Sequence, residues 1–160
     1  MRTILAIDPG TATTGFAILE SDKKSIRLLD CGCIITKPKQ PLSRRLVIIA
    51  KDLRRLVSRY HPQELAVEQL FFAKNAKTAL SVGQARGVVL LIGAENQLKI
   101  SEYTPLQVKQ ALTGYGQADK KQIQNMVKTI LDLATIPKPD DAADAAAIGL
   151  CHLQTNNFIN

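Results

Sequence analysis

The stretch LAIDPG, residues 5–10, ends an apolar run with a carboxylate and then breaks the chain with Pro and Gly. Asp8 before Pro9 and Gly10 is a common way to begin a turn, because an Asp side chain can hydrogen-bond the backbone that follows. The same position, at the end of a buried strand, also suits a metal-binding carboxylate. The second interpretation requires further carboxylates close to Asp8 in the fold.

The pattern on either side of this stretch predicts an α/β protein. Short β-branched runs separated by polar turns predict three strands in an antiparallel meander, after which helical periods alternate with two more strands. That order predicts a mixed five-stranded sheet flanked by helices. The expected strands are residues 2–8, 14–20, 26–36, 64–68 and 99–103. The expected helices are 42–60, 78–97, 105–112, one opened by an Asp119 cap, and one that follows an Asp140 cap and runs to about 154.

The composition indicates one folded domain over residues 1–160, the last few of which we expect to be disordered. Apolar residues make up 46 % of the chain and charged residues 22 %, as in ordinary globular domains. Three cysteines cannot form a complete disulfide framework, and no apolar stretch is long enough to span a membrane. We therefore expect a cytoplasmic protein without membrane contact.

The net charge of +7 is high for this length and suits a polyanionic partner such as nucleic acid. A surface that is merely soluble is the alternative. If several of the acids form a metal site, the rest of the surface is more basic than the total indicates.

Four of the fourteen acids are not explained by turns or polar helix faces. Asp8 and Glu68 each end a predicted strand. Asp141 and Asp144 are three residues apart at the start of the last helix, so they share one face. The alanines around them would let this helix lie close on the sheet and bring its acids near the strand carboxylates. The alternative for the helical pair is a favourable interaction with the helix dipole.

Several carboxylates in one cleft repel each other, and burying them unpaired is costly. Ligand sets made only of oxygen favour Mg²⁺ or Mn²⁺, and neither His61 nor His152 lies in these motifs, which argues against zinc. Two such ions about 4 Å apart can assist in-line displacement at a phosphodiester. A carboxylate cluster within a basic protein therefore predicts a nuclease.

Aromatic and basic residues follow the Glu68 strand in a polar loop. An aromatic ring can stack on an unpaired base while lysines bind phosphates, and Phe71 with Lys74 and Lys77 would suit these roles. Of the two adjacent rings we expect Phe72 to point inward and Phe71 outward. Lys120 begins a helix, where a lysine opposes the helix dipole and so has another purpose.

The helix expected over residues 78–97 is apolar nearly all round from Val88 onward. Gly83 and Gly87 are one turn apart in it, and small residues at that spacing let another backbone approach closely. Two interpretations remain open: a subunit interface that would include Gly83, Gly87 and Leu90, or the central core helix of a monomer.

Four segments stand out: IDPGTATTGFAIL (7–19), AVEQLFFAKNAKTALSVGQARGVVL (66–90), VKQALTGYGQADKKQIQNMV (108–127) and PDDAADAAAIGLCH (139–152). Together they resemble the RuvC family of Holliday junction resolvases over residues 2–153. The resemblance implies an RNase H-like fold, a homodimer, and resolution of four-way DNA junctions by paired symmetric nicks in recombination and repair. It further implies two Mg²⁺ ions in each site, for which Mn²⁺ can substitute, and the RuvA–RuvB branch-migration complex as a partner.

The resemblance also implies roles for single residues. Its DNA-facing aromatic falls on Phe71, its catalytic-centre lysines fall on Lys109 and Lys120, and its dimer helix falls on residues 78–97. The chain departs from many relatives in the turn Thr11-Ala12-Thr13, where those relatives carry a basic residue. The family's catalytic, metal-binding acids fall on Asp8, Glu68, Asp141 and Asp144.

Three rival functions share parts of this pattern. An acid, a glycine and a Thr-rich turn also open the phosphate loop of sugar-kinase-like ATPases, which need two such domains. An RNase H-like nuclease acting on RNA would keep the acids but not the loop after Glu68 or the dimer helix. A non-catalytic junction-binding module would be expected to lack one of the four acids, and none is lacking.

Overall fold

The computed structural model describes residues 1–22, 25–70 and 76–157, and it contains the expected mixed sheet. The strand order is β3-β2-β1-β4-β5. The first three strands pair antiparallel through short connections, whereas β4 and β5 run parallel to β1 after helical crossovers. The strands are β1 (Arg2–Asp8), β2 (Thr13–Ser21), β3 (Ile26–Ile35), β4 (Glu64–Glu68) and β5 (Lys99–Tyr103).

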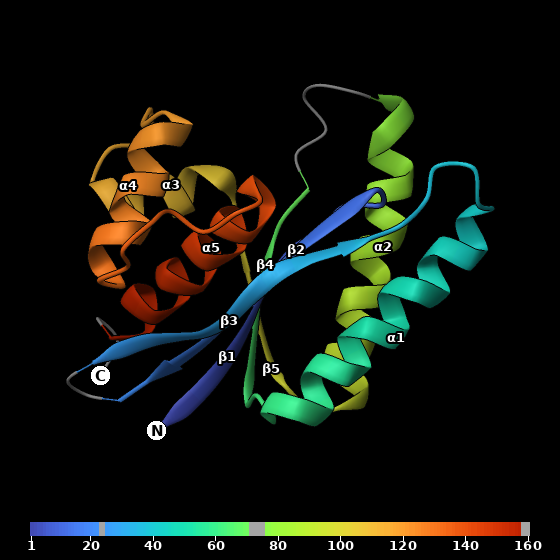
Figure 1. Cartoon of the computed structure of the whole chain (residues 1–160), viewed down its shortest axis with the longest axis horizontal. Coiled ribbons are helices and arrows are strands. Elements are labelled where there is room, and N and C mark those ends of the chain that lie inside the picture. The colour runs from blue at the N-terminus through green and yellow to red at the C-terminus, as the bar shows by residue number, and fades with distance from the viewer. Residues whose placement is uncertain (23–24, 71–75, 158–160) are drawn as a thin grey trace.

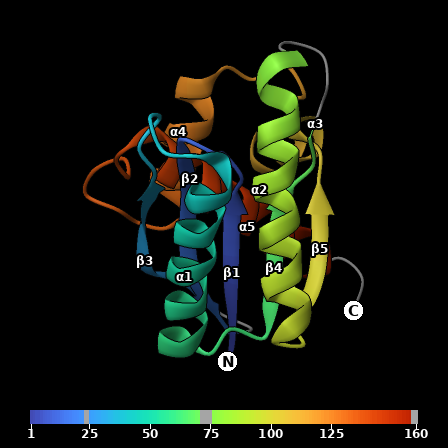
Figure 2. The ribbon, with the colours of Figure 1, turned by 90° about the vertical axis from the view of Figure 1, so that its right-hand side faces the viewer.

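Helices cover both faces of the sheet, as Figures 1 and 2 show. One face carries α1 (Leu42–Tyr60) and α2 (Ala76–Glu95). The other carries α3 (Pro105–Thr113), α4 (Lys120–Ile130) and α5 (Asp140–Asn157). In the described part of the chain no helix is long and apolar enough to cross a membrane.

The alternation of side chains along β1 and β4 decides which way the strand-end acids point. Ala6 of β1 and Ala66 of β4 pack in the core under α5, whereas Ile7 and Val67 pack in the core under α1 and α2. Because successive side chains of a strand point to opposite faces, Asp8 and Glu68 fall on the α5 face. The alternation of side chains along β1 and β4 thus points both carboxylates to the same face of the sheet.

The alanine-rich start of α5 lies close on the sheet, as its sequence predicts. Ala145 and Ala146 are fully buried and share a core with the small residues Ala6 and Ala17 of β1 and β2. This close packing brings the first turn of α5 to the carboxyl end of β1.

Two predicted helix starts can be compared with the structure. The Asp119 cap is confirmed: its carboxylate accepts a hydrogen bond from the Gln122 backbone N–H at 2.8 Å, and the Gln122 side chain accepts from the Asp119 N–H. The last helix begins one residue earlier than expected, with Asp140 as its first residue. The Asp140 side chain accepts a hydrogen bond from Gln124 of α4.

Candidate active site

Three carboxylates meet where β1 ends beneath the first turn of α5. One oxygen each from Asp8, Asp141 and Asp144 lies within 4.8 Å of the other two. Asp8 is placed there by the alternation of β1, and the two helical acids by their shared face at the start of α5. Residues from opposite ends of the chain therefore form one cluster, which a turn cap at Asp8 would not require.

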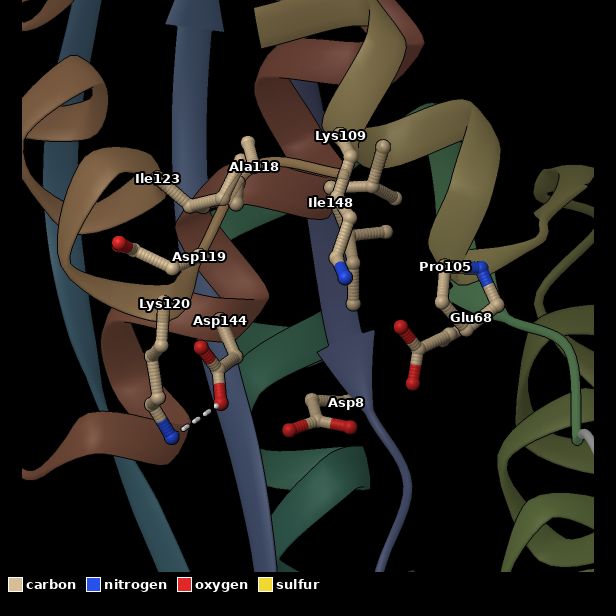
Figure 3. A pocket seen from close by; sticks show the side chains of 12 residues that line it. Asp8, Glu68, Pro105, Lys109, Ala118, Asp119, Lys120, Ile123, Asp144 and Ile148 are labelled. Carbon is tan, nitrogen blue, oxygen red and sulfur yellow. Dashed lines mark hydrogen bonds and ion pairs between the residues drawn. The ribbon is translucent and has the colours of Figure 1, made fainter. Parts of the chain in front are cut away.

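Glu68 faces the same space without belonging to the tight cluster. A cavity of about 260 Å³ is lined by Asp8, Glu68 and Asp144, together with Lys109 of α3 and Lys120 of α4. Figure 3 shows the Asp8 carboxylate between those of Glu68 and Asp144. Because β4 runs parallel to β1, its last residue reaches the same edge of the sheet as Asp8.

Burial and mutual repulsion raise the pKa values of three acids in this site, Asp8, Glu68 and Asp144. Burial, followed by the charges of Glu68, Asp144 and Asp141, raises the pKa of Asp8 to about 8. Burial and then the charge of Asp144 raise the pKa of Glu68 to about 7. The pKa of Asp144 is also raised, chiefly by burial, although Lys120 opposes the change.

The donor set fits a divalent metal. A cation among these oxygens would offset the repulsion that raises the pKa values, and oxygen-only ligands favour a hard ion such as Mg²⁺ or Mn²⁺. Asp8, Asp141 and Asp144 could hold one ion directly, and Glu68 lies across the cavity from them as a further donor.

Lys120 supplies a positive charge beside the carboxylate cluster. Its Nζ lies 3.2 Å from Asp144 Oδ2 and 3.4 Å from Asp140 Oδ2. Partial burial lowers the pKa of Lys120, but the hydrogen bonds and charges of Asp144 and Asp140 outweigh that effect and raise it. A lysine that opposes the dipole of its own helix is thus explained by carboxylates on another helix.

Both histidines lie apart from the described carboxylate cluster. His152 is fully buried in α5, with its Nε2 2.6 Å from Glu64 Oε2 and its Nδ1 2.8 Å from the Tyr103 hydroxyl. Burial lowers the pKa of His152 despite the neighbouring Glu64, so the neutral ring donates to Glu64 and accepts from Tyr103. This arrangement joins α5 to β4 and β5 and is structural.

The residues expected to contact DNA from the loop after β4 cannot be placed. Phe71, Phe72 and Lys74 lie outside the described residues, and so does the side chain of Lys77. Of the predicted DNA-binding residues, Lys109 and Lys120 are described, and both line the cavity.

The apolar residues of α2 divide between the core and the solvent. Gly83 faces its own chain, since a Cβ there would lie 3.3 Å from Leu70 Cδ1, and Leu90 is half-buried against the core. Gly87 faces open space. Sequence reasoning did not single out Leu80 and Leu91, which are 71 % and 54 % exposed; with Gly87 they recur at positions 80, 87 and 91, one stripe of a helix.

Arg86, inside the QARG sequence of α2, is a third residue that the sequence did not single out. Its Nε donates to the Glu68 backbone carbonyl at 3.3 Å, and its guanidinium also pairs with Glu102 of β5. Arg86 thereby ties the end of β4, and with it Glu68, to α2. Its position within a motif of the family resemblance was the available signal.

A family model described as crossover junction endodeoxyribonuclease RuvC matches residues 4–152. The chain belongs to the RuvC family. It is 54 % identical over 151 residues to crossover junction endodeoxyribonuclease RuvC of Desulforamulus reducens, covering 94 % of this chain and 93 % of that one. It is also 54 % identical over 149 residues to the RuvC of Halothermothrix orenii, covering 93 % and 90 % of the two chains.

Solved RuvC structures share the architecture. Thermus thermophilus RuvC in complex with Holliday junction substrate superposes with a TM-score of 0.93 at 34 % identity, covering 99 % of this chain and 96 % of that one. The yeast mitochondrial resolvase Ydc2, at 14 % identity and a TM-score of 0.71, shares the fold. The RNase H-like sheet expected from the RuvC resemblance is confirmed.

Proposed function

We propose that this RuvC-family chain resolves four-way DNA junctions by hydrolysing one phosphodiester in each of two strands. The observation that carries the proposal is the convergence of Asp8, Asp141 and Asp144, with Glu68 and two lysines, around one open cavity. The T. thermophilus RuvC solved with a Holliday junction supports the choice of substrate.

The carboxylates act as the metal ligands of the site. We infer Mg²⁺ as the natural ion, with two ions in each site and Mn²⁺ as a substitute, because all the donors are hard oxygens. When bound, such a pair activates water and stabilises the leaving oxygen. The role of Asp8 is to present a carboxylate to the metal from a rigid strand end, and Asp141 and Asp144 do the same from the first turn of α5.

The two lysines act on the substrate side of the cavity. Lys120 is held at Asp144 by its ion pair, and Lys109 extends from α3 into the same space (Figure 3). A phosphate in the cavity would therefore lie among two ammonium groups and the metal-binding acids. Such fixed positive charge stabilises the negative charge that develops during phosphodiester hydrolysis.

A homodimer would give the enzyme two such sites. The exposed stripe of Leu80, Gly87 and Leu91 on α2 is an apolar surface that a second copy could cover. Two-fold symmetry then presents identical sites to two strands of like polarity, as paired symmetric nicks require. The family resemblance adds the RuvA–RuvB complex as a partner of the dimer.

The substrate class is tested by offering the protein a mobile four-way DNA junction, a linear duplex of the same sequence and a folded RNA. In Mg²⁺ we expect nicks in two opposed strands of the junction and none in the other two substrates. Equal cutting of linear duplex, or preferential cutting of RNA, would contradict junction resolution. Binding to the junction without cutting would favour the non-catalytic alternative.

A further inference from the structure

A second cavity adjoins the carboxylate cluster on the side of Asp141. It measures about 400 Å³ and lies between the turn after β1 and the first turns of α1 and α2. Asp141 lines this cavity, whereas Asp8 and Asp144 line the first one. The residues that give this Thr11–Arg45 pocket its chemistry are Thr11, Thr13, Arg45, Thr78 and Ser81.

Arg45 brings a positive charge into this pocket and is held there by hydrogen bonds. Its Nε donates to Thr36 Oγ1 at 2.7 Å, and that hydroxyl donates to the Thr11 carbonyl at 2.6 Å. Among the ion pairs between described residues, none involves Arg45. The guanidinium therefore keeps donors that can bind an anion.

Thr11 contributes a buried hydroxyl that has no partner within the described structure. The residue is 6 % exposed, and its Oγ1 makes no hydrogen bond to any described group. A buried polar group without a partner is unfavourable, so its retention calls for an explanation. An oxygen-rich ligand in the pocket would accept its hydrogen bond.

The two helices beside the pocket also favour negative charge. The N-terminal ends of α1 and α2 both lie at the end of the sheet where β1 ends (Figure 2). Neither helix has an acidic residue in its first turn. Unpaired backbone N–H groups at such ends carry partial positive charge.

We propose that the Thr11–Arg45 pocket binds a backbone phosphate of the cleaved strand, adjacent to the scissile one. The proposal rests on the junction-cutting function, because a strand with its scissile phosphate at the carboxylate cluster would bring a neighbouring phosphate to the adjoining cavity that Asp141 lines. The Asp141 carboxylate repels an anion, which places the phosphate on the Arg45 and Thr11 side. Arg45 then supplies from α1 the positive charge that the Thr11-Ala12-Thr13 turn lacks.

Two substitutions separate this contact from a structural role. Thr11→Val removes the hydroxyl and keeps the shape; it should weaken junction binding several-fold while leaving the melting temperature unchanged or higher, because an unpaired buried hydroxyl is lost. Arg45→Gln should weaken binding about tenfold and reduce the slope of log affinity against log salt by about 1. Arg44→Gln is the matched control, since it removes the same charge from the neighbouring, exposed position.

A scan of neutral methylphosphonate linkages identifies the phosphate. Each junction carries one such linkage near the cleavage point; affinity is measured in EDTA and cleavage in Mg²⁺. One linkage should weaken binding of the wild type about tenfold and have no further effect in Arg45→Gln. Wild-type protein that fails to cut the unmodified junction would overturn the proposed function itself.

If the wild type cuts, three results would overturn the pocket alone. Arg45→Gln could match Arg44→Gln, Thr11→Val could bind as the wild type does, or no single linkage could lose its effect in Arg45→Gln. Should Arg45→Gln fail to fold, Thr11→Val and the scan of the wild type decide: unchanged affinity in either one rejects the pocket, and loss of affinity in both supports it.

Discussion

Gly15 of β2 lies so close to Asp141 that a Cβ at position 15 would stand 2.0 Å from the Asp141 carbonyl oxygen. Gly15 is also the register partner of Asp8 across the β1–β2 pair. The absence of a side chain there is what lets the first turn of α5 reach the end of β1. The meeting of Asp8 and Asp141 therefore depends on a residue that contributes no functional group.

Gly15→Ala should consequently displace Asp141 and slow junction cleavage by about 100-fold, since misplacement of a reacting group by about 1 Å has effects of this size. Overpacking should also lower the free energy of unfolding by about 1–3 kcal/mol. Cleavage rate at saturating junction and urea unfolding measure the two effects. Gly32→Ala on β3 is the control, because its Cβ would meet only the Phe16 ring, at 3.1 Å, away from α5. Equal loss in both variants would argue against a specific role for Gly15.

Lys120→Ala should slow cleavage by about 10–100-fold with the junction saturated, because it removes positive charge beside the cavity. The same change should cost no more than about 1 kcal/mol of stability, since its ion pair with Asp144 is partly exposed. Single-turnover kinetics and thermal unfolding make the comparison. The neighbouring, exposed Lys121→Ala should cut at nearly the wild-type rate, and an equal defect there would reduce Lys120 to one of many surface charges.

The raised pKa of Asp8 makes the metal-free protein less stable as the pH rises. A carboxyl with a pKa of about 8 in the fold and an ordinary value of 3.8 favours the folded state most below pH 4, and that contribution is lost between about pH 4 and pH 8. In EDTA, Asp8→Asn should therefore raise the free energy of unfolding at pH 8 by about 2 kcal/mol, which corresponds to a melting temperature about 6 °C higher. At pH 4 the same substitution should change the melting temperature little. Mg²⁺ should stabilise the wild type more than the variant. The same increase at both pH values would show that Asp8 does not titrate in this range.

The spacing of apolar residues along the sequence predicts more of the fold than of the surroundings of the site. Alternation along the strands and alanine spacing in α5 were enough to place Asp8, Glu68, Asp141 and Asp144 at one edge of the sheet. By helical period, Arg45 belongs to a charged, solvated face of α1. Only the packing of α1 against the turn after β1 brings it to Thr11, and that long-range contact leaves no trace in local spacing.

The same limit applies to α2. Its apolar residues read as continuous, but the structure divides them between a core face with Ala85 and Val89 and an exposed stripe with Leu80 and Leu91. Which face meets the sheet depends on where β4 and β5 lie. Helical spacing alone therefore left core helix and subunit interface as equal alternatives, and only the family resemblance favoured the interface.

Covering the α2 stripe by a second copy should make the protein a dimer at micromolar concentration. Leu91→Lys would bury a charge without a partner and should raise the dimer dissociation constant about 100-fold or more. Gly87→Leu should act in the same direction by blocking close approach. Sedimentation measures both, with Leu106→Lys on α3 as the control because Leu106 is also 54 % exposed. A monomeric wild type would rule out this interface.

The most direct test of the carboxylate centre measures junction binding and Mg²⁺-dependent cutting for Asp8→Asn, Glu68→Gln, Asp141→Asn and Asp144→Asn on one four-way junction. Each variant should lose cutting by about 1,000-fold or more while binding the junction as tightly as the wild type or more tightly, because a metal ligand and a charge that repels phosphate are removed together. Near-wild-type cutting in Mg²⁺ by any one of the four would remove that residue from the centre, and near-wild-type cutting by all four would contradict the metal-dependent site itself.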